Sequence, residues 1–194
     1  MVELTINKNN TEVIQSLNLN IQETIILKNV EEYFLNNDNF KILESIVNGS
    51  NCISRRTIEY LVTKYSNIMN TTYFINNNKK KIKFNIYSSY KDKLKCYRKK
   101  YFDPFGRGDR IPFFSNNTCI ITTIGQLNFY KWFITNDIYK YCKENHNDIQ
   151  KSLLENFSKN KKKPSAKKNY SLYKNSIIKN QYISPVNLSV TFDV

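Results

Sequence analysis

Residue types that commonly build catalytic and metal sites are scarce in this sequence. Among its 194 residues are one histidine and four cysteines, and no C-x-x-C pair, Walker loop or G-x-G-x-x-G segment occurs. Zinc-finger spacing is therefore absent, and only a convergence of distant cysteines would make a metal site. His146 lies in a polar N-H-N-D context, and no carboxylates have the spacing of a two-metal site. We therefore expect no enzyme, no catalytic residue, no metal and no cofactor.

Long hydrophobic runs are also missing. No stretch approaches the ~20 apolar residues of a membrane-spanning helix, and the N-terminus has no apolar signal core. We expect an intracellular protein that does not bind membranes. Its cysteines should be reduced, and buried free thiols are favoured over a four-cysteine metal site assembled from distant positions.

Positive charge, by contrast, is abundant and unevenly distributed. Thirty Lys and Arg face 16 acidic residues, which gives a net charge of +14, usual for proteins that bind a polyanion. Residues 1–50 carry a net −4, residues 79–110 a net +9 and residues 151–185 a net +8. Asn, Lys and Ile are common, as in AT-rich coding sequences, so part of the lysine content reflects composition. The five arginines are therefore better candidates for specific contacts.

The first two strongly helical segments have the outline of a helix-turn-helix. Apolar residues recur at three- and four-residue spacing between Glu31 and Val47, Gly49 suits a left-handed cap, and Ser54 suits the N-cap of the next helix. The unit, at 38–66, would present Arg55, Arg56 and Thr57 to the major groove of DNA. An ordinary helical hairpin with solvated arginines is the alternative.

A β-hairpin is predicted at 72–86, directly after this unit. Two strand-like segments, 72–75 and 82–86, flank a polar turn. A helix-turn-helix followed by a hairpin is the outline of a winged helix, which binds DNA. The candidate phosphate contacts in or near this wing are Lys79, Lys80, Lys81 and Lys83.

A basic helix and a glycine-containing loop follow the hairpin. The helix is predicted from Ser88 or Ser89 to about Phe102, and the loop covers residues 103–110. Glycines let main-chain N–H groups approach a phosphate, and Asp103 and Asp109 would brace the arginines. A purely structural turn, held by phenylalanines, is an equal alternative. The candidate phosphate contacts in this region are Lys95, Arg98, Lys99, Arg107 and Arg110.

The remaining segments complete an α+β fold with a predominantly helical core. After a strand-like run, a capping box at Thr123 and Gln126 starts a central buried helix over 124–141, and an amphipathic helix follows at about 148–157. We predict an N-terminal arm at 1–30 and the core, with the helix-turn-helix-like unit and the hairpin, at 31–158. A basic flexible linker is predicted at 159–185, and a C-terminal strand at 186–194 that returns to the body.

Two segments are distinctive: F-D-P-F-G-R-G-D-R-I at 102–111 and T-T-I-G-Q-L-N-F-Y-K-W at 122–132. They resemble the F-D-P-F-x-R-x-x-R-I and T-T-x-G-Q-L-N-F-F-x-W segments of a group of uncharacterised proteins from nucleocytoplasmic large DNA viruses, the giant viruses. The stretch I-S-R-R-T-I-E-Y-L-V-T-K-Y is also similar to that group, so the resemblance covers about residues 53–141. It implies a viral origin and supplies no catalytic residues. Gly106 stands where that group has a Cys, Ala or similar small residue.

The sequence favours a nucleic-acid-binding protein of such a virus, serving genome organisation, replication or transcription, with DNA favoured over RNA as the partner. We expect it in the viral factory of the host cytoplasm or in the virion, with the nucleus as an alternative. The other function class is a non-enzymatic virion or scaffold protein. Such a protein would bind acidic protein partners through the same basic surface and would form a homo-oligomer.

Overall fold

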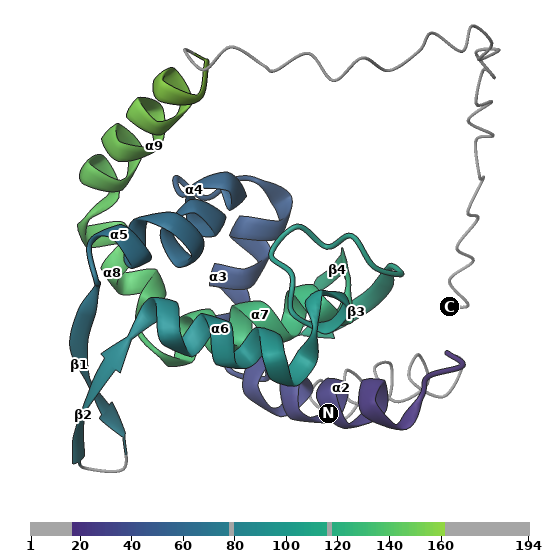
Figure 1. Ribbon diagram of the computed structural model, residues 1–194. Coiled ribbons are helices and arrows are strands. Elements are labelled where there is room, and N and C mark those ends of the chain that lie inside the picture. The colour runs from purple at the N-terminus through teal and green to yellow at the C-terminus, as the bar shows by residue number, and fades with distance from the viewer. Residues whose placement is uncertain (1–16, 78–79, 116–117, 162–194) are drawn as a thin grey trace, which may run out of the picture. The chain divides into compact units, whose positions relative to one another are not determined.

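The computed structural model describes residues 17–77, 80–115 and 118–161 of the chain (Figure 1). In these ranges the fold is α+β and mostly helical, as the sequence predicts, and it has two small antiparallel β-hairpins where the sequence predicts one. Helix α7 (Ile124–Thr135) lies at the centre and contacts α2, α3, α8 and the short helix η2. None of the described helices is long and apolar enough to span a membrane.

The chain enters the core earlier than the sequence indicates. Helix α2 (Ile21–Phe34) begins at Asn20, which accepts from the Glu23 amide while Glu23 accepts from the Asn20 amide, a complete capping box. The helix buries Ile26, Leu27, Val30 and Phe34 and packs against α7. Residues from 21 onward therefore belong to the core and not to the N-terminal arm predicted at 1–30.

The predicted helical stretch between Glu31 and Val47 is two helices, because α2 ends at Phe34 and α3 (Asn37–Asn48) begins after the N-cap Asn36. Gly49 ends α3 in the left-handed conformation with φ 77°, which confirms that prediction. Ser54 caps α4 (Arg55–Tyr60) by accepting from the Thr57 amide, also as predicted. The same helix continues through the π-helical turn η1 (Leu61–Tyr65) and α5 (Ser66–Ile68).

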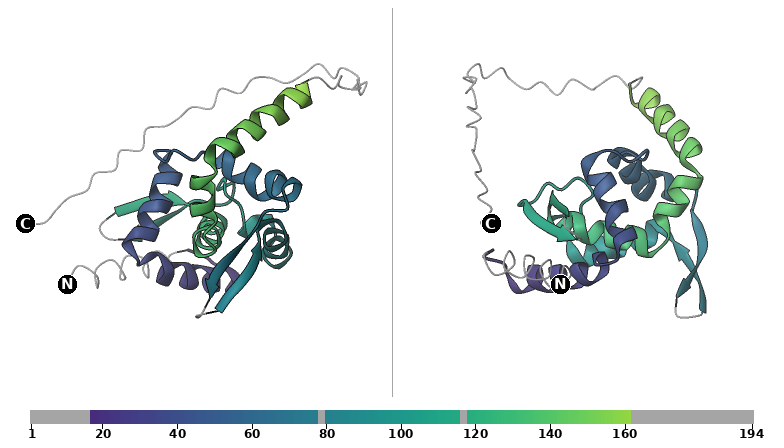
Figure 2. Two further views of the ribbon diagram at one scale, coloured as in Figure 1. Left: turned by 90° about the vertical axis from the view of Figure 1, so that its left-hand side faces the viewer. Right: turned by 180° about the vertical axis from the view of Figure 1, so that it is seen from behind.

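The first hairpin is confirmed. Strand β1 (Thr72–Asn77) pairs with β2 (Lys80–Asn85), in a register that runs from Thr72↔Asn85 to Asn77↔Lys80. Tyr73 stacks on Tyr141 of α8 with ring centroids 5.5 Å apart. This contact holds the base of the hairpin, whereas the strands extend away from the helices in the right-hand view of Figure 2.

Helix α6 (Ile86–Tyr97) begins and ends earlier than predicted. Its N-cap is Asn85, which accepts from the Ser88 amide, so Ser88 lies inside the helix and is not its cap. The helix stops at Arg98, where φ is 58°, and the 3-10 turn η2 (Lys99–Tyr101) follows. Phe102 is then buried against Phe129 and Trp132.

A second hairpin precedes α7, where the sequence indicated only a strand-like run. Strands β3 (Ile111–Ser115) and β4 (Thr118–Thr122) pair antiparallel, and they bury Ile111, Phe113 and Ile120. The loop leading into β3 contains the residues of the candidate site.

The central helix is shorter than predicted. Helix α7 ends at Thr135, and after Asp137, whose φ is 55°, the chain continues as α8 (Ile138–Glu144). Phe129, Tyr130 and Phe133 of α7 are fully buried, and each such ring contributes on the order of 1.5–3 kcal/mol. Thr123 accepts from the Gln126 amide as predicted. The reciprocal half of the capping box is wrong, because the Gln126 side chain bonds elsewhere.

The last described element, α9 (His146–Lys161), is longer than the predicted 148–157. It therefore takes in the first residues of the linker predicted at 159–185. The rest of that linker and the strand predicted at 186–194 lie outside the described residues.

Candidate nucleic-acid interface

The loop between η2 and β3 is held by a charged pair. Arg107 donates to Asp103 from Nε at 3.1 Å and from Nη2 at 3.0 Å, so Asp103 braces this arginine as predicted. The guanidinium also lies over the Phe105 ring, 5.2 Å from its centre. The Arg107 side chain remains 68% exposed, whereas that of Asp103 is 12% exposed. Hydrogen bonding to Asp103 raises the pKa of Arg107, so the exposed guanidinium keeps its charge in a fixed orientation.

Helix α7 fixes the backbone of this loop. The Pro104 carbonyl accepts from Gln126 Nε2 and from the Tyr130 hydroxyl, each at 3.1 Å. Gln126 Oε1 accepts from Thr122 at 3.0 Å, so the buried amide joins the loop to β4. Gly106 has φ 63°, and a Cβ there would lie 2.6 Å from Gln126 Oε1. In this chain both the backbone conformation and the close approach of the amide therefore favour glycine at this position.

The first turn of α4 lies near the loop. Burial raises the pKa of Tyr130, the residue that donates to Pro104, and the charge of Arg55 acts on it in the opposite direction. Arg107 is in turn within electrostatic range of Glu59, on the same helix as Arg55. Arg55 of α4 and Asp103 of the loop therefore act on the same buried hydroxyl, and Glu59 of α4 acts on Arg107.

The other two predicted residues of α4 have different contacts. Arg56 is exposed and lies over the Phe157 ring of α9, 5.5 Å from its centre. Thr57 is fully buried, and its hydroxyl is 2.8 Å from Ser54 Oγ. Thr57 therefore helps to cap the helix and cannot reach a DNA groove, which corrects its place in the predicted set.

Lys80, Lys81 and Lys83 are exposed on β2, and Lys79 lies outside the described residues. Cross-strand pairing places Lys81 opposite Asn76 and Lys83 opposite Phe74. None of the three described lysines forms an ion pair with a described residue. Their charge is therefore available to a partner.

The end of α6 and the start of β3 add further cations. Lys95 pairs with Asp92 at 3.5 Å, but both side chains are more than 70% exposed, so the pair is weak. Arg98, Lys99 and Arg110 are exposed and form no ion pair with the described part of the chain. Arg98, at the end of α6, has a positive φ, which is a strained conformation for a residue with a side chain.

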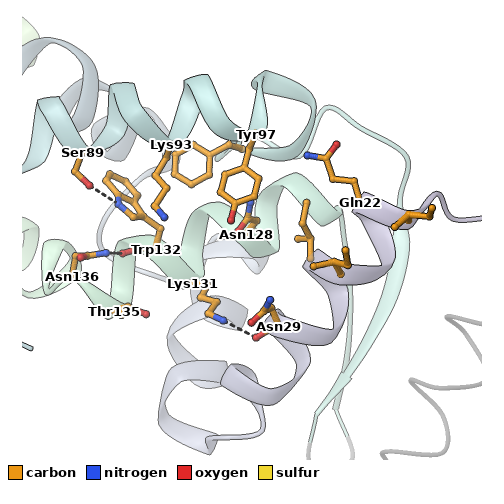
Figure 3. Close-up of a pocket in the computed structure, with 14 residues that line it drawn as sticks. Gln22, Asn29, Ser89, Lys93, Tyr97, Asn128, Lys131, Trp132, Thr135 and Asn136 are labelled. Carbon is orange, nitrogen blue, oxygen red and sulfur yellow. Dashed lines mark hydrogen bonds between the residues drawn. The ribbon is translucent and has the colours of Figure 1, made fainter. Parts of the chain in front are cut away.

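A groove of about 700 Å³ lies between α2 and α6, with α7 as its floor (Figure 3). Trp132 donates to Ser89 at 3.0 Å, and Lys131 donates to the Asn29 carbonyl at 2.7 Å. Ile21 and Ile25 on α2 are 82% and 57% exposed along its edge. The lining contains Lys93 and Lys131 and no acidic residue, so the groove suits an apolar group that carries negative charge. The sequence did not indicate it, because α2 was not recognised there.

The described residues contain no group of three or more His, Cys, Asp or Glu that could hold a metal ion. All four cysteines are free, and only Cys142 is buried, which corrects the expectation of buried thiols. Burial raises the pKa of Cys142 to about 12, so this thiol is unreactive. Cys52, Cys96 and Cys119 are exposed and far from one another in sequence.

Sequence comparison places the chain beside giant-virus proteins. A family model described as "Family of unknown function (DUF7197)" matches residues 3–190. The chain is also 37% identical over 124 residues to "Uncharacterized protein L507" of Acanthamoeba polyphaga mimivirus, covering 61% of this chain and 48% of that protein. It thus spans about half the length of this curated relative. No solved structure matches.

Proposed function

Because the chain belongs to this family of unknown function, its role must be inferred from its own surface, and we propose that it binds nucleic acid in a giant DNA virus. Genome organisation, replication or transcription would be the setting, in the viral factory of the host cytoplasm or in the virion. DNA is the favoured partner over RNA, and the role is non-enzymatic.

The observation that carries the proposal is a set of cations along one continuous stretch of chain, most of which form no ion pair with a described residue; Lys95, Lys100 and Arg107 are the paired ones, Lys100 with Glu23 at 3.0 Å. Between Lys80 and Arg110 the described residues hold eleven Lys and Arg and three acids. Of those acids, Asp103 pairs with Arg107, and Asp92 makes only a solvent-exposed contact. A surface of this kind gains free energy from releasing the counterions of a phosphate backbone.

Two of the three residues predicted in the helix-turn-helix-like unit, Arg55 and Arg56, remain in this proposal. Arg55 would act with Arg107 on one phosphate region, and Arg56 would act separately near α9. With Thr57 buried, the first turn of α4 offers two long cationic side chains and no short polar one. We therefore assign phosphate contact to this turn and leave base reading to other residues.

The test is fluorescence anisotropy of labelled duplex and single-stranded oligonucleotides, titrated with wild type and with two double variants, Arg55→Ala/Arg56→Ala and Arg107→Ala/Arg110→Ala. Each variant should bind about tenfold more weakly, since each loses charge-assisted contacts. The exposed lysines of α2 and α3 supply the control, Lys28→Ala/Lys41→Ala, which should bind as wild type does. The single variant Arg110→Ala keeps the Arg107–Asp103 pair, so weaker binding by this variant cannot be caused by unfolding of the loop. Absence of wild-type binding at about 50 mM salt would refute the proposal.

The groove of Figure 3 favours a second candidate function, a virion or scaffold role with self-association. Ile21 and Ile25 would seat against a second copy of the chain, since exposed apolar side chains beside a cleft are typical of interfaces. This role predicts a discrete oligomer in sedimentation velocity, which Ile21→Ser/Ile25→Ser would convert to monomer. No nucleic acid would copurify, so the ratio of absorbance at 260 and 280 nm separates the two functions.

A further inference from the structure

The β1–β2 hairpin has two chemically different faces. Side chains alternate along a strand, so Tyr73 and Ile75 share one face with their cross-strand partners Phe84 and Ile82. The opposite face carries Phe74 and Asn76 with their partners Lys83 and Lys81. The first face is apolar, and the second combines one aromatic ring with two lysines.

The apolar face is the one turned toward the helices. Tyr73 packs on Phe84 and Tyr141, with ring centroids 5.6 Å and 5.5 Å away. Its hydroxyl donates to the Asn136 carbonyl at 2.7 Å. Burial raises the pKa of Tyr73, so the hydroxyl keeps its proton for this hydrogen bond. The hairpin is thus fixed to the body, and the Phe74 face points away from it.

Phe74 is 69% exposed on this outward face. Directly opposite side chains in an antiparallel pair have Cβ atoms about 4.5–5.5 Å apart, and diagonal neighbours about 7–8 Å. Phe74 therefore lies directly opposite Lys83 and diagonal to Lys81 on the same face of the hairpin. Both lysines are exposed and form no ion pair with any described residue.

We propose that this outward face, Phe74 with Lys81 and Lys83, is a stacking site for an unpaired base of a nucleic-acid strand. The ring would stack on the base, and the two ammonium groups would contact the phosphates on either side of it. Aromatic rings interleaved with lysines bind single strands in this way, without strong sequence preference, because every base has a π-face. The inference rests on the proposed function and names the contact that distinguishes a single strand from a duplex.

The positive charge of this face disfavours a second copy of the chain as its partner. A self-association surface built on Phe74 would bring Lys81 and Lys83 of two copies together, and like charges in contact are unfavourable. The apolar face of the same hairpin offers a matched comparison, since Ile82 is also an exposed large apolar side chain, at 44%.

The test measures binding of a single-stranded and a duplex oligonucleotide to wild type, Phe74→Ala, Phe74→Trp and the control Ile82→Ala. Phe74→Ala should weaken single-strand binding about tenfold and duplex binding less than twofold. Ile82→Ala should change neither. Phe74→Trp should retain binding, and its fluorescence should be quenched by the single strand, whereas the wild-type signal from the buried Trp132 stays constant.

The outcomes separate the two proposals. If wild type binds both oligonucleotides and Phe74→Ala binds them equally well, the stacking site is wrong and the proposed function stands. If Phe74→Ala changes only the sedimentation of the protein, the face is a protein interface and the stacking site is again wrong. If wild type binds neither oligonucleotide, both proposals fall.

Discussion

At Gly106 a single residue satisfies two independent requirements of the loop. Its φ of 63° is costly for any residue with a Cβ, by roughly 1–2 kcal/mol. The space where a Cβ would stand is taken by Gln126 Oε1, and the same amide binds Thr122 and Pro104. The orientation of Arg107 therefore depends on a neighbouring residue that has no side chain.

We expect Gly106→Ala to lower the free energy of unfolding by about 2–4 kcal/mol, because backbone strain and displaced hydrogen bonds of a buried amide add. Urea denaturation followed by circular dichroism measures it. Gly49→Ala is the matched control: φ is 77° there, but no atom lies within 4 Å of the added Cβ, so only about 1 kcal/mol should be lost. Equal losses in the two variants would show that the Gln126 contact is unimportant.

Single residues with strong local signals could be predicted from the sequence. Gly49 and Ser54 have conformational preferences that act within one turn of a helix. Asp103 precedes Arg107 by only four residues, so their pairing is also a local interaction. Gln126 was assigned to a capping box because the motif fits. In the structure its side chain instead donates a hydrogen bond to the Pro104 carbonyl, 22 residues away in the sequence, and no local rule identifies such a partner.

At the scale of elements, Asn85 connects the first hairpin to α6. Its side-chain oxygen accepts from the Ser88 amide at 2.9 Å, and its nitrogen donates to Asn70 and Thr72 at 3.0 and 3.1 Å. One amide therefore starts the basic helix and fixes where the hairpin ends.

Asn85→Ala should lower the free energy of unfolding by about 1–2 kcal/mol, the usual effect of losing an N-cap. Ser88→Ala should change it by less than about 0.5 kcal/mol, since Ser88 is an exposed residue within the first turn. Thermal or urea denaturation of the two variants, side by side, checks this. A larger loss in Ser88→Ala would indicate that the helix starts at the later position.

The limits of the helices were harder to predict than their existence. Helix α7 stops before Asp137 and α6 stops at Arg98, and both residues have positive φ without being glycine. Periodicity continues through such breaks, because the apolar positions Ile138 and Phe102 on the far side are still buried. Tertiary packing sets these ends, and it is not visible in a local window.

At the scale of the whole molecule, charge is divided along the sequence. Residues 1–50 carry a net −4 and residues 79–110 a net +9. A polyanion should therefore contact the second region, and the affinity should depend on salt through the cations located there.

For duplex DNA, the slope of log Kobs against log salt should become shallower by about 0.9 for each hairpin lysine that contacts a phosphate. We expect this in Lys80→Gln/Lys81→Gln/Lys83→Gln, measured by anisotropy between about 50 and 200 mM salt. The control Lys28→Gln/Lys41→Gln removes charge from α2 and α3, outside the basic region, and should leave the slope unchanged. An equal change in both variants would show that binding reflects net charge alone.

The candidate site was predictable as a list of charges but not as an arrangement. Composition identified the basic region, yet it could not show that Arg56 lies over Phe157 or that Thr57 is buried. The sequence does not single out Phe74, because an aromatic residue in a strand is normally part of a core and only the register shows which face it occupies.

The hydrogen bond from Tyr73 to Asn136 has a mechanical consequence. Asn136 is the C-cap of α7, and α8 begins two residues later. Tyr73 therefore connects the hairpin to the turn between these helices and not to the middle of a helix. A force applied to the hairpin would therefore act on the backbone between α7 and α8.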